Sequence, residues 1–214
     1  PRMHPSDFVM HSQDGVGVDW PIRYADLDPY YALNERMMGT SGLAGDPAYP
    51  PKAPPVTGPL PIGAANRRLA AAFETLGWPW WPADLAVLSA PVGERGACNH
   101  CGPCELGCPT GAKASVDVTY WPAAIGAGAR LVTGARVREI EIDGSGRARG
   151  VVFRDRAGNT RRARAGRVLL AANGLGTPRL LLLSRSGRFP DGLANRTGLV
   201  GRHLMLHPLA RVTG

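Results

Sequence analysis

Glycine and proline interrupt this chain at short intervals, which limits how long any helix or strand can run. Together they account for 48 of the 214 residues, nearly twice their share of roughly 12% in an average protein. Proline favours turns because it fixes φ and lacks an N–H, and glycine because it tolerates positive φ. The 44% of hydrophobic residues still allows a sizeable core. We therefore expect a globular, loop-rich fold, and the composition excludes collagen and coiled coil.

The chain is basic, with a formal net charge of +8, and all but two of its 25 Lys and Arg residues are arginine. Such a bias, in a chain rich in Ala, Gly and Pro, is more typical of a GC-rich coding background than of nucleic-acid binding. The one dense basic run, residues 161–167, alternates like the exposed face of a strand. No nucleic-acid partner is predicted.

The sequence also lacks the apolar run that a membrane span requires. The longest candidate, Leu180–Leu183, stops at Ser184, whereas a spanning helix needs ~18 apolar residues. No membrane span is expected in this segment. The chain starts at Pro1, with neither an initiator Met nor the layout of a secretory signal, so we interpret it as an internal fragment.

Helical spacing and capping residues predict three helices. Asp28 followed by Pro29 is typical of a helix start, which predicts a helix from Pro29 to Met38. Apolar spacing predicts further helices over 64–76 and 119–127. Between the first two, residues 39–62 are dominated by Gly and Pro and predict a lid or binding loop. Three tryptophans after the second helix are expected to pack under a loop: Trp78, Trp80 and Trp81.

Strand-like segments separated by glycine turns follow, and they predict a β-meander: 130–133, 136–142, 150–155 and 160–165. The apolar segment 167–172 then predicts a buried strand that leads through a glycine turn into a helix, with Thr177 as its cap and Pro178 at its first position. A strand, a glycine turn and a helix N-terminus form an anion-binding arrangement. The predicted fold class is therefore α/β (α+β).

All four cysteines lie in one short run and are the strongest chemical signal in the chain. Cys98, Cys101, Cys104 and Cys108 have the spacing C-x2-C-x2-C-x3-C-P, which is that of the bacterial ferredoxin run around an iron–sulfur cluster. The fourth cysteine of such a run commonly serves another cluster, so a three-thiolate 3Fe-4S cluster is an alternative to 4Fe-4S. Four cysteines so close together are also compatible with structural zinc, with disulfides or with free thiols, although each fits this spacing less well.

Four stretches of the sequence, in this order, resemble the glucose–methanol–choline (GMC) oxidoreductases: residues 19–31, 107–113, 171–182 and 200–208. The likeness covers nearly the whole chain and is closest to the flavoprotein subunits of bacterial sugar and polyol dehydrogenases. Some of those subunits carry an iron–sulfur cluster on cysteines spaced six and four apart. Cys98, Cys104 and Cys108 have that spacing.

The resemblance implies an FAD enzyme that oxidises an alcohol or sugar CH–OH group by hydride transfer to the flavin. It implies that the backbone of Val137 meets the adenine, and that Ala172, Asn173 and Gly174 lie near the FAD. The sequence departs from the family's second signature at residues 173–174 and 184–185. The implied partners are a small alcohol or sugar and a cytochrome or small subunit that accepts electrons. The sequence does not indicate the compartment, and the bacterial cytoplasm and a periplasmic or membrane-associated complex both stay open.

By the same resemblance, residues 1–214 form the middle portion of a GMC FAD-binding N-terminal domain with a long loop at 39–62 and a cysteine loop at 96–114. The Gly-rich fingerprint for the FAD pyrophosphate is expected before residue 1 and the catalytic His after residue 214, so this segment alone should be inactive. A non-catalytic iron–sulfur or metal-binding electron-transfer module is the alternative from another class. An oxidase that uses dioxygen is a third.

Two spatial expectations follow for the structure. Val137 and the 172–174 turn should approach one common cavity, since α/β folds place ligands at strand ends. The sulfurs of Cys98, Cys104 and Cys108 should turn toward a single point, with Cys101 aside, as a three-thiolate cluster requires.

Overall fold

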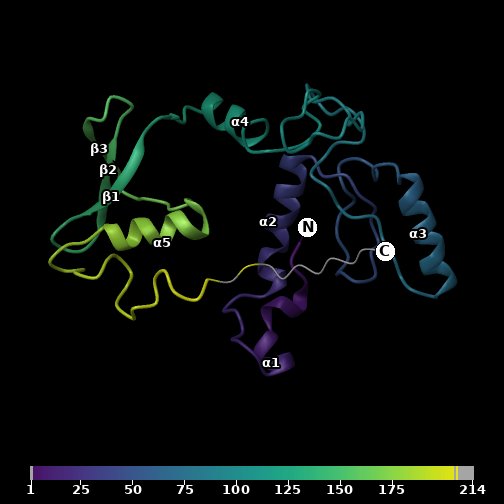
Figure 1. The fold of residues 1–214 in the computed structure, drawn as a ribbon, viewed down its shortest axis with the longest axis horizontal. Coiled ribbons are helices and arrows are strands. Elements are labelled where there is room, and N and C mark those ends of the chain that lie inside the picture. The colour runs from purple at the N-terminus through teal and green to yellow at the C-terminus, as the bar shows by residue number, and fades with distance from the viewer. Residues whose placement is uncertain (1, 205, 207–214) are drawn as a thin grey trace. The chain divides into compact units, whose positions relative to one another are not determined.

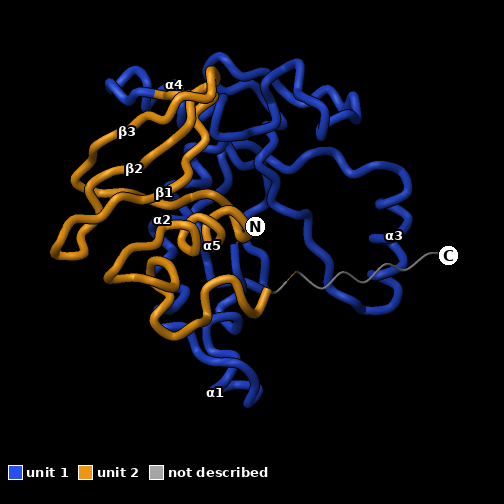
Figure 2. The backbone as a smooth tube through the Cα atoms, turned by 60° about the vertical axis from the view of Figure 1, so that its left-hand side comes forward, with its two compact units in different colours: residues 1–130 blue, residues 131–214 orange. Residues whose placement is uncertain are grey.

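The computed structural model describes residues 2–204 and 206, and the chain divides into two compact units, residues 1–130 and 131–214 (Figures 1 and 2). None of the described helices is long and apolar enough to cross a membrane. The fourth GMC-like stretch ends in Met205, His207 and Pro208, which lie outside the described residues.

The first unit consists of short helices joined by long loops (Figure 1). The only β pairing among its described residues is made by isolated bridges. Its elements are the 3-10 helix η1 (Pro5–Phe8) and the helices α1 (Met10–Asp14), α2 (Tyr24–Met38), α3 (Ala64–Thr75) and α4 (Tyr120–Gly126). Helices α3 and α4 confirm the predictions over 64–76 and 119–127 to within one residue at each end.

Helix α2 begins five residues earlier than predicted, at Tyr24 rather than Pro29. The Arg23 backbone N–H donates to Asp26 Oδ2 at 2.8 Å, which satisfies a donor at the new start. Pro29 then lies inside the helix, where it has no N–H to donate to the carbonyl four residues earlier. Asp28 is not the cap.

Asp28 instead takes part in a buried ion network that joins the N-terminal segment to α2. The buried Arg2 guanidinium donates to Glu35 Oε1 and Oε2 at 2.8 and 2.9 Å, to Tyr24 Oη at 2.9 Å, and to Asp28. This contact spans 26 residues, and local capping rules cannot anticipate it.

The 39–62 loop has no helix or strand, as predicted, but its two ends are held by backbone bonds. Ser41 and Leu85 exchange N–H···O bonds of 2.8 and 3.0 Å, and the Val56 N–H donates to Thr40 O at 2.8 Å. Lys52, nearly buried, also pairs with Asp84. These contacts tie the loop to the 84–85 segment.

The second unit is built on the predicted β-meander, an antiparallel sheet in the order β1 (Arg136–Ile142), β2 (Ala148–Arg154) and β3 (Thr160–Arg164). Helix α5 (Asn173–Leu183) packs against β1, and the Ile140 N–H donates to Ser184 Oγ at 2.9 Å. Ile140 and Leu180 are buried. The predicted strand at 130–133 is wrong, because that segment pairs with no other described residue.

The predicted strand over 167–172 is wrong for the same reason. Its backbone has no neighbouring strand among the described residues, and Leu169 is 88% exposed. An extended segment becomes a strand only when another strand supplies donors and acceptors.

The helix after this segment also starts earlier than predicted, at Asn173 rather than beside Thr177. Asn173 adopts φ +61° and its Oδ1 accepts the N–H groups of Leu175 and Gly176, both at 2.9 Å. Thr177 accepts the Ala172 N–H at 3.2 Å. Asn173, the first residue of the helix, therefore binds two of the N–H groups of the first turn with its own side chain.

Candidate functional site

Backbone pairing closes the base of the cysteine loop. Leu88 accepts the Cys98 N–H at 2.9 Å and donates its own N–H to Ala112 O at 3.0 Å, while the Gly96 N–H donates to Thr110 O at 2.8 Å. A Cβ at Gly96 would lie 3.0 Å from Thr110 O, so glycine permits this close approach. The residues between Cys98 and Cys108 therefore project from a fixed base.

The four thiols are free, and the structure does not gather them. Cys98 and Cys108 are half-buried, whereas Cys101 and Cys104 are exposed. The described residues contain no group of three or more His, Cys, Asp or Glu side chains placed to hold a metal ion. The expectation that Cys98, Cys104 and Cys108 share one point is therefore not met in this structure.

Hydrogen bonds within the loop explain this orientation. The His100 N–H donates to Cys98 Sγ at 3.4 Å, and the Lys113 N–H donates to Cys108 Sγ at 3.3 Å. The sulfurs of Cys98 and Cys108 thus each accept a backbone N–H of a nearby residue, His100 and Lys113 respectively.

Cys108 has the most polar surroundings of the four cysteines. The Lys113 backbone N–H and the Thr110 hydroxyl, 3.6 Å from the sulfur, stabilise the thiolate and lower the pKa of Cys108 to about 7. Hydrogen bonds that favour the charged form act in this direction. This cysteine is the one whose surroundings favour metal ligation or nucleophilic chemistry.

Arg95 connects this turn to the C-terminus of α2. Its guanidinium donates to the carbonyls of Met38, Gly111 and Ala112 at 2.7, 2.9 and 2.8 Å. Burial lowers the pKa of Arg95, and the nearby Cys108 charge opposes that shift. The sequence contains no signal for this clamp, because its three acceptors are backbone groups distant along the chain.

The residues predicted to approach FAD lie on β1 and at the start of α5. Val137 is half-buried and opposite Phe153 in the sheet, and residues 172–174 are exposed. Ser184 follows the C-terminal end of α5 and contacts Ile140 of β1. An eleven-residue helix is about 16 Å long, so the 172–174 turn lies one helix length from that contact.

One side of β1 is not paired with another strand among the described residues. β1 is an edge strand of the sheet, so its outer side presents backbone N–H and C=O groups. Ile140 already uses one such N–H to bind Ser184. At the other end of α5, a Cβ built on Gly174 would meet no atom within 4 Å. Gly174 thus has space beside its backbone.

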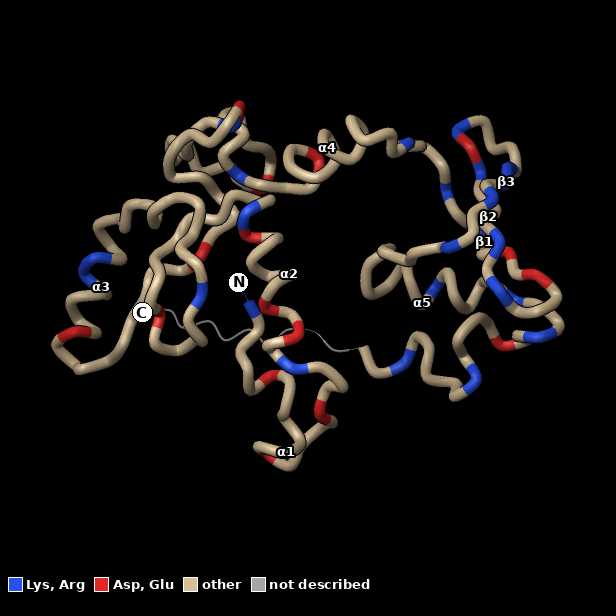
Figure 3. The backbone as a smooth tube through the Cα atoms, turned by 180° about the vertical axis from the view of Figure 1, so that it is seen from behind, with Lys and Arg blue, Asp and Glu red and all other residues tan. Residues whose placement is uncertain are grey.

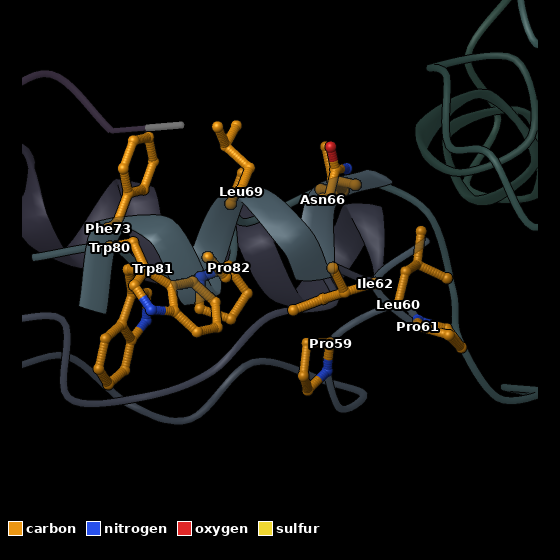
Figure 4. Close-up of a pocket in the computed structure, with 13 residues that line it drawn as sticks. Pro59, Leu60, Pro61, Ile62, Asn66, Leu69, Phe73, Trp80, Trp81 and Pro82 are labelled. Carbon is orange, nitrogen blue, oxygen red and sulfur yellow. The ribbon is translucent and has the colours of Figure 1, made fainter. Parts of the chain in front are cut away.

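An apolar cavity of about 340 Å³ lies beside α3 (Figure 4). Asn66, Leu69 and Phe73 follow one another along the helix, with the tryptophans near the Phe73 end and residues 59–62 near the Asn66 end. Trp80 Nε1 donates to Glu74 at 3.3 Å and Trp81 Nε1 to Leu43 O at 3.0 Å. The prediction that the tryptophans pack under a loop did not include this cavity, which Trp80 and Trp81 line. Tryptophans beside an amphipathic helix could have indicated it.

Comparison with known proteins gives matches along nearly the whole chain. A family model described as GMC oxidoreductase matches residues 23–209. The 2-methyl-1,2-propanediol dehydrogenase of Mycolicibacterium austroafricanum is 42% identical over 98% of this chain and 38% of its own length. The fructose dehydrogenase large subunit of Gluconobacter japonicus is 37% identical over 97% of this chain and 38% of its own length.

A third relative is the 6'''-hydroxyparomomycin C oxidase of Streptomyces lividus. It is 40% identical over 96% of this chain and 39% of its own length. The chain thus spans less than two fifths of the length of each of these curated relatives.

Proposed function

The chain belongs to the GMC oxidoreductase family, and on that premise we propose that it is part of an FAD-dependent enzyme that oxidises the CH–OH group of a small alcohol or sugar. The observation that carries the proposal is the 42% identity over 98% of the chain to a diol dehydrogenase. The names of the other relatives, a fructose dehydrogenase large subunit and a 6'''-hydroxyparomomycin C oxidase, support a polyhydroxylated substrate.

In this proposal the second unit holds the cofactor. Val137 offers the edge-strand backbone of β1 to the adenine, and Ala172, Asn173 and Gly174 lie along the FAD at the start of α5. When bound, the flavin supplies the hydride acceptor for the alcohol carbon. The open backbone at β1 and at Gly174 supports this assignment. Asn173 fixes the turn by binding the N–H groups of Leu175 and Gly176.

We further propose that the cysteine loop binds an iron–sulfur cluster through Cys98, Cys104 and Cys108, with Cys101 as the fourth ligand if the cluster is 4Fe-4S. The spacing of the cysteines and their free thiols support this proposal. Since the sulfurs do not converge in this structure, no step of the reaction is derived through the cluster. An electron-accepting cytochrome or small subunit is the proposed partner, and the words "large subunit" in the name of the fructose dehydrogenase relative support a partner subunit.

A visible spectrum of the purified full-length protein tests the flavin proposal. We expect flavin absorption that bleaches when a polyol is added without oxygen, because the hydride from the substrate reduces the flavin. A protein that contains no flavin, or whose flavin no alcohol reduces, would contradict it. A protein with iron and sulfide but no flavin would favour the electron-transfer module.

The cluster proposal has a separate test, iron and sulfide analysis of single serine variants in the full-length protein. Replacement of Cys98, Cys104 or Cys108 should remove the cluster while flavin content stays unchanged, and Cys101→Ser distinguishes three from four ligands. If all four variants keep their iron and their electron transfer to an acceptor, the cluster proposal is wrong.

A further inference from the structure

The charge of this chain is divided unequally between its two units. Residues 131–214 carry 16 arginines and five carboxylates, a net charge of +11, whereas residues 1–130 carry nine basic and twelve acidic residues. Figure 3 shows the basic positions of the second unit gathered around the meander and α5. The overall charge of +8 therefore comes from the second unit alone.

The register of the sheet places four arginines on one face, which we call the outer face. Arg136 is opposite Arg154, Arg162 is opposite Val152, and Arg164 is opposite Gly150. Residues directly opposite in neighbouring strands share a face, and so do alternate residues of one strand. All four arginines are exposed.

The other face of the same sheet is the packed one. It carries Ile140 and Val151 opposite each other, and Phe153 two residues further along β2. Ile140 is buried and the other two are half-buried. Arg161, opposite Phe153, and Ala163, opposite Val151, lie on this face too and are exposed. The four arginines of the outer face therefore lie on the side of the sheet that faces away from Ile140.

Ion pairing within the chain neutralises only part of the outer face. Arg162 Nε lies 2.7 Å from Glu141 Oε1. Arg136, Arg154 and Arg164 have no carboxylate within 4 Å among the described residues. Three exposed guanidinium groups on this face are therefore available to a partner.

Protection of the sheet edge explains some of these arginines and not others. Charged residues on an edge strand discourage pairing with another sheet, which accounts for Arg162 and Arg164 on β3. β2 is the central strand, and Arg154 lies there directly opposite Arg136. Like charges in directly opposite positions destabilise a sheet. This pair needs a reason other than folding.

We propose that the outer face of the meander is a docking surface for a partner protein that presents a carboxylate-rich face, with Arg136 and Arg154 as its centre. Arginine binds carboxylates through two parallel hydrogen bonds and is enriched at protein interfaces. A carboxylate between the two guanidinium groups removes their mutual repulsion. Arg136 directly precedes Val137, whose backbone is assigned to FAD. The inference uses only the side chains of the outer face and does not depend on the flavin chemistry.

The composition of the outer face favours a protein over nucleic acid or an anionic membrane. Glu139 and Glu141 lie among the arginines, since Glu139 is opposite Val152 and Glu141 is opposite Gly150. They would repel an unbroken row of phosphates, whereas a protein can place a basic group opposite them. The face carries no aromatic side chain that could stack on a base or enter a bilayer interface.

Binding of a labelled peptide of alternating glutamate and alanine to the full-length holoenzyme tests the proposal, with fluorescence anisotropy as the readout at low and at physiological salt. We expect saturable binding that weakens with salt. The double variant Arg136→Glu, Arg154→Glu should weaken it by about tenfold or more. The variant with lysine at both positions should retain most of the binding, because the charge is kept.

Matched controls separate this face from the general charge of the unit. The double variant Arg188→Glu, Arg196→Glu makes the same charge change at exposed positions outside the sheet and should bind the peptide within about twofold of the parent. Equal loss in this control would overturn the proposal, as would an unchanged affinity in the Arg136, Arg154 variant. Tighter, Arg136- and Arg154-dependent binding of a DNA duplex or of phosphatidylserine vesicles would overturn the assignment to a protein.

Discussion

At the scale of single residues, Cys108 differs from the other cysteines in the groups that surround its sulfur. A backbone N–H and a hydroxyl stabilise its thiolate, and the guanidinium of Arg95 is held in the same turn. The thiolate is the form that ligates metals and attacks electrophiles. The hydrogen bonds of the loop thus favour the thiolate form of Cys108 without a bound metal.

The low pKa of Cys108 predicts its reaction with iodoacetamide. In iron-free full-length protein, the alkylation rate at Cys108, followed by peptide mass spectrometry, should reach half its maximum near pH 7 rather than near the ordinary value of 9.0. Thr110→Val removes one of the stabilising hydrogen bonds, so the midpoint should move upward. A midpoint that stays near 9 in the parent, or does not respond to Thr110→Val, would contradict this account.

At the scale of elements, the two hairpins of the meander are built on one device. Each turn starts with an aspartate whose carbonyl accepts the N–H of a glycine at positive φ, Gly146 at 2.9 Å and Gly158 at 3.0 Å. The Asp143 carboxylate also accepts the N–H groups of Ser145 and Arg147 at 2.9 and 3.1 Å. In such turns the aspartate carboxylate accepts hydrogen bonds from backbone N–H groups that have no backbone carbonyl within reach.

Replacement of Asp143 should therefore destabilise the meander. Hydrogen bonds hold the pKa of Asp143 far below its ordinary value. The Ser145 hydroxyl has the largest effect and the Arg147 N–H the next largest. A carboxylate with a lowered folded-state pKa adds stability that is fully present above its unfolded-state pKa, near 4, and is lost as the pH falls toward the folded value. We expect Asp143→Ala to lower Tm at neutral pH, and to lower it less in acid.

Asp191→Ala is the matched control for this thermal melt. Asp191 is exposed and its side chain makes no hydrogen bond among the described residues. Equal losses of Tm in the two variants would show that the carboxylate of the turn has no special part in stability.

At the scale of the whole molecule, the segment that joins the two units is exposed to solvent and has no regular secondary structure. Residues 127–134 form no helix or strand and are exposed throughout. Backbone of this kind opens locally at little cost and is a preferred site of proteolysis.

Limited trypsin digestion of the full-length protein should consequently cut first after Arg130. Arg130→Gln should remove that early cut and leave later cuts unchanged, as read from the masses of the first fragments. Arg167, which is also exposed in a segment without regular structure, serves as the internal comparison. First cleavage elsewhere, with Arg130 intact, would show that this segment is covered in the folded protein.

The sequence alone determined the parts of this protein whose interactions are local. Helices α3 and α4 follow from apolar spacing and the meander follows from alternation with glycine turns. The cysteine spacing and the stretches that resemble the GMC family are likewise readable from the chain. In each case the residues that form the structure lie within a few positions of one another, so short windows of sequence contain the relevant physics.

Only the tertiary structure decided the features that need a distant partner. Because α2 starts at Tyr24, Asp28 is not a cap, and it bonds the guanidinium of Arg2, which is 26 residues away. The extended segment 167–172 is not a strand, because no described strand pairs with it. The position of the Cys108 sulfur is set by its hydrogen bond to the Lys113 N–H. The spacing of the cysteines does not indicate this bond. Arg136 and Arg154 face each other only through the register of β1 and β2. Such pairings depend on long-range packing and register, which the order of residues in any one segment does not contain.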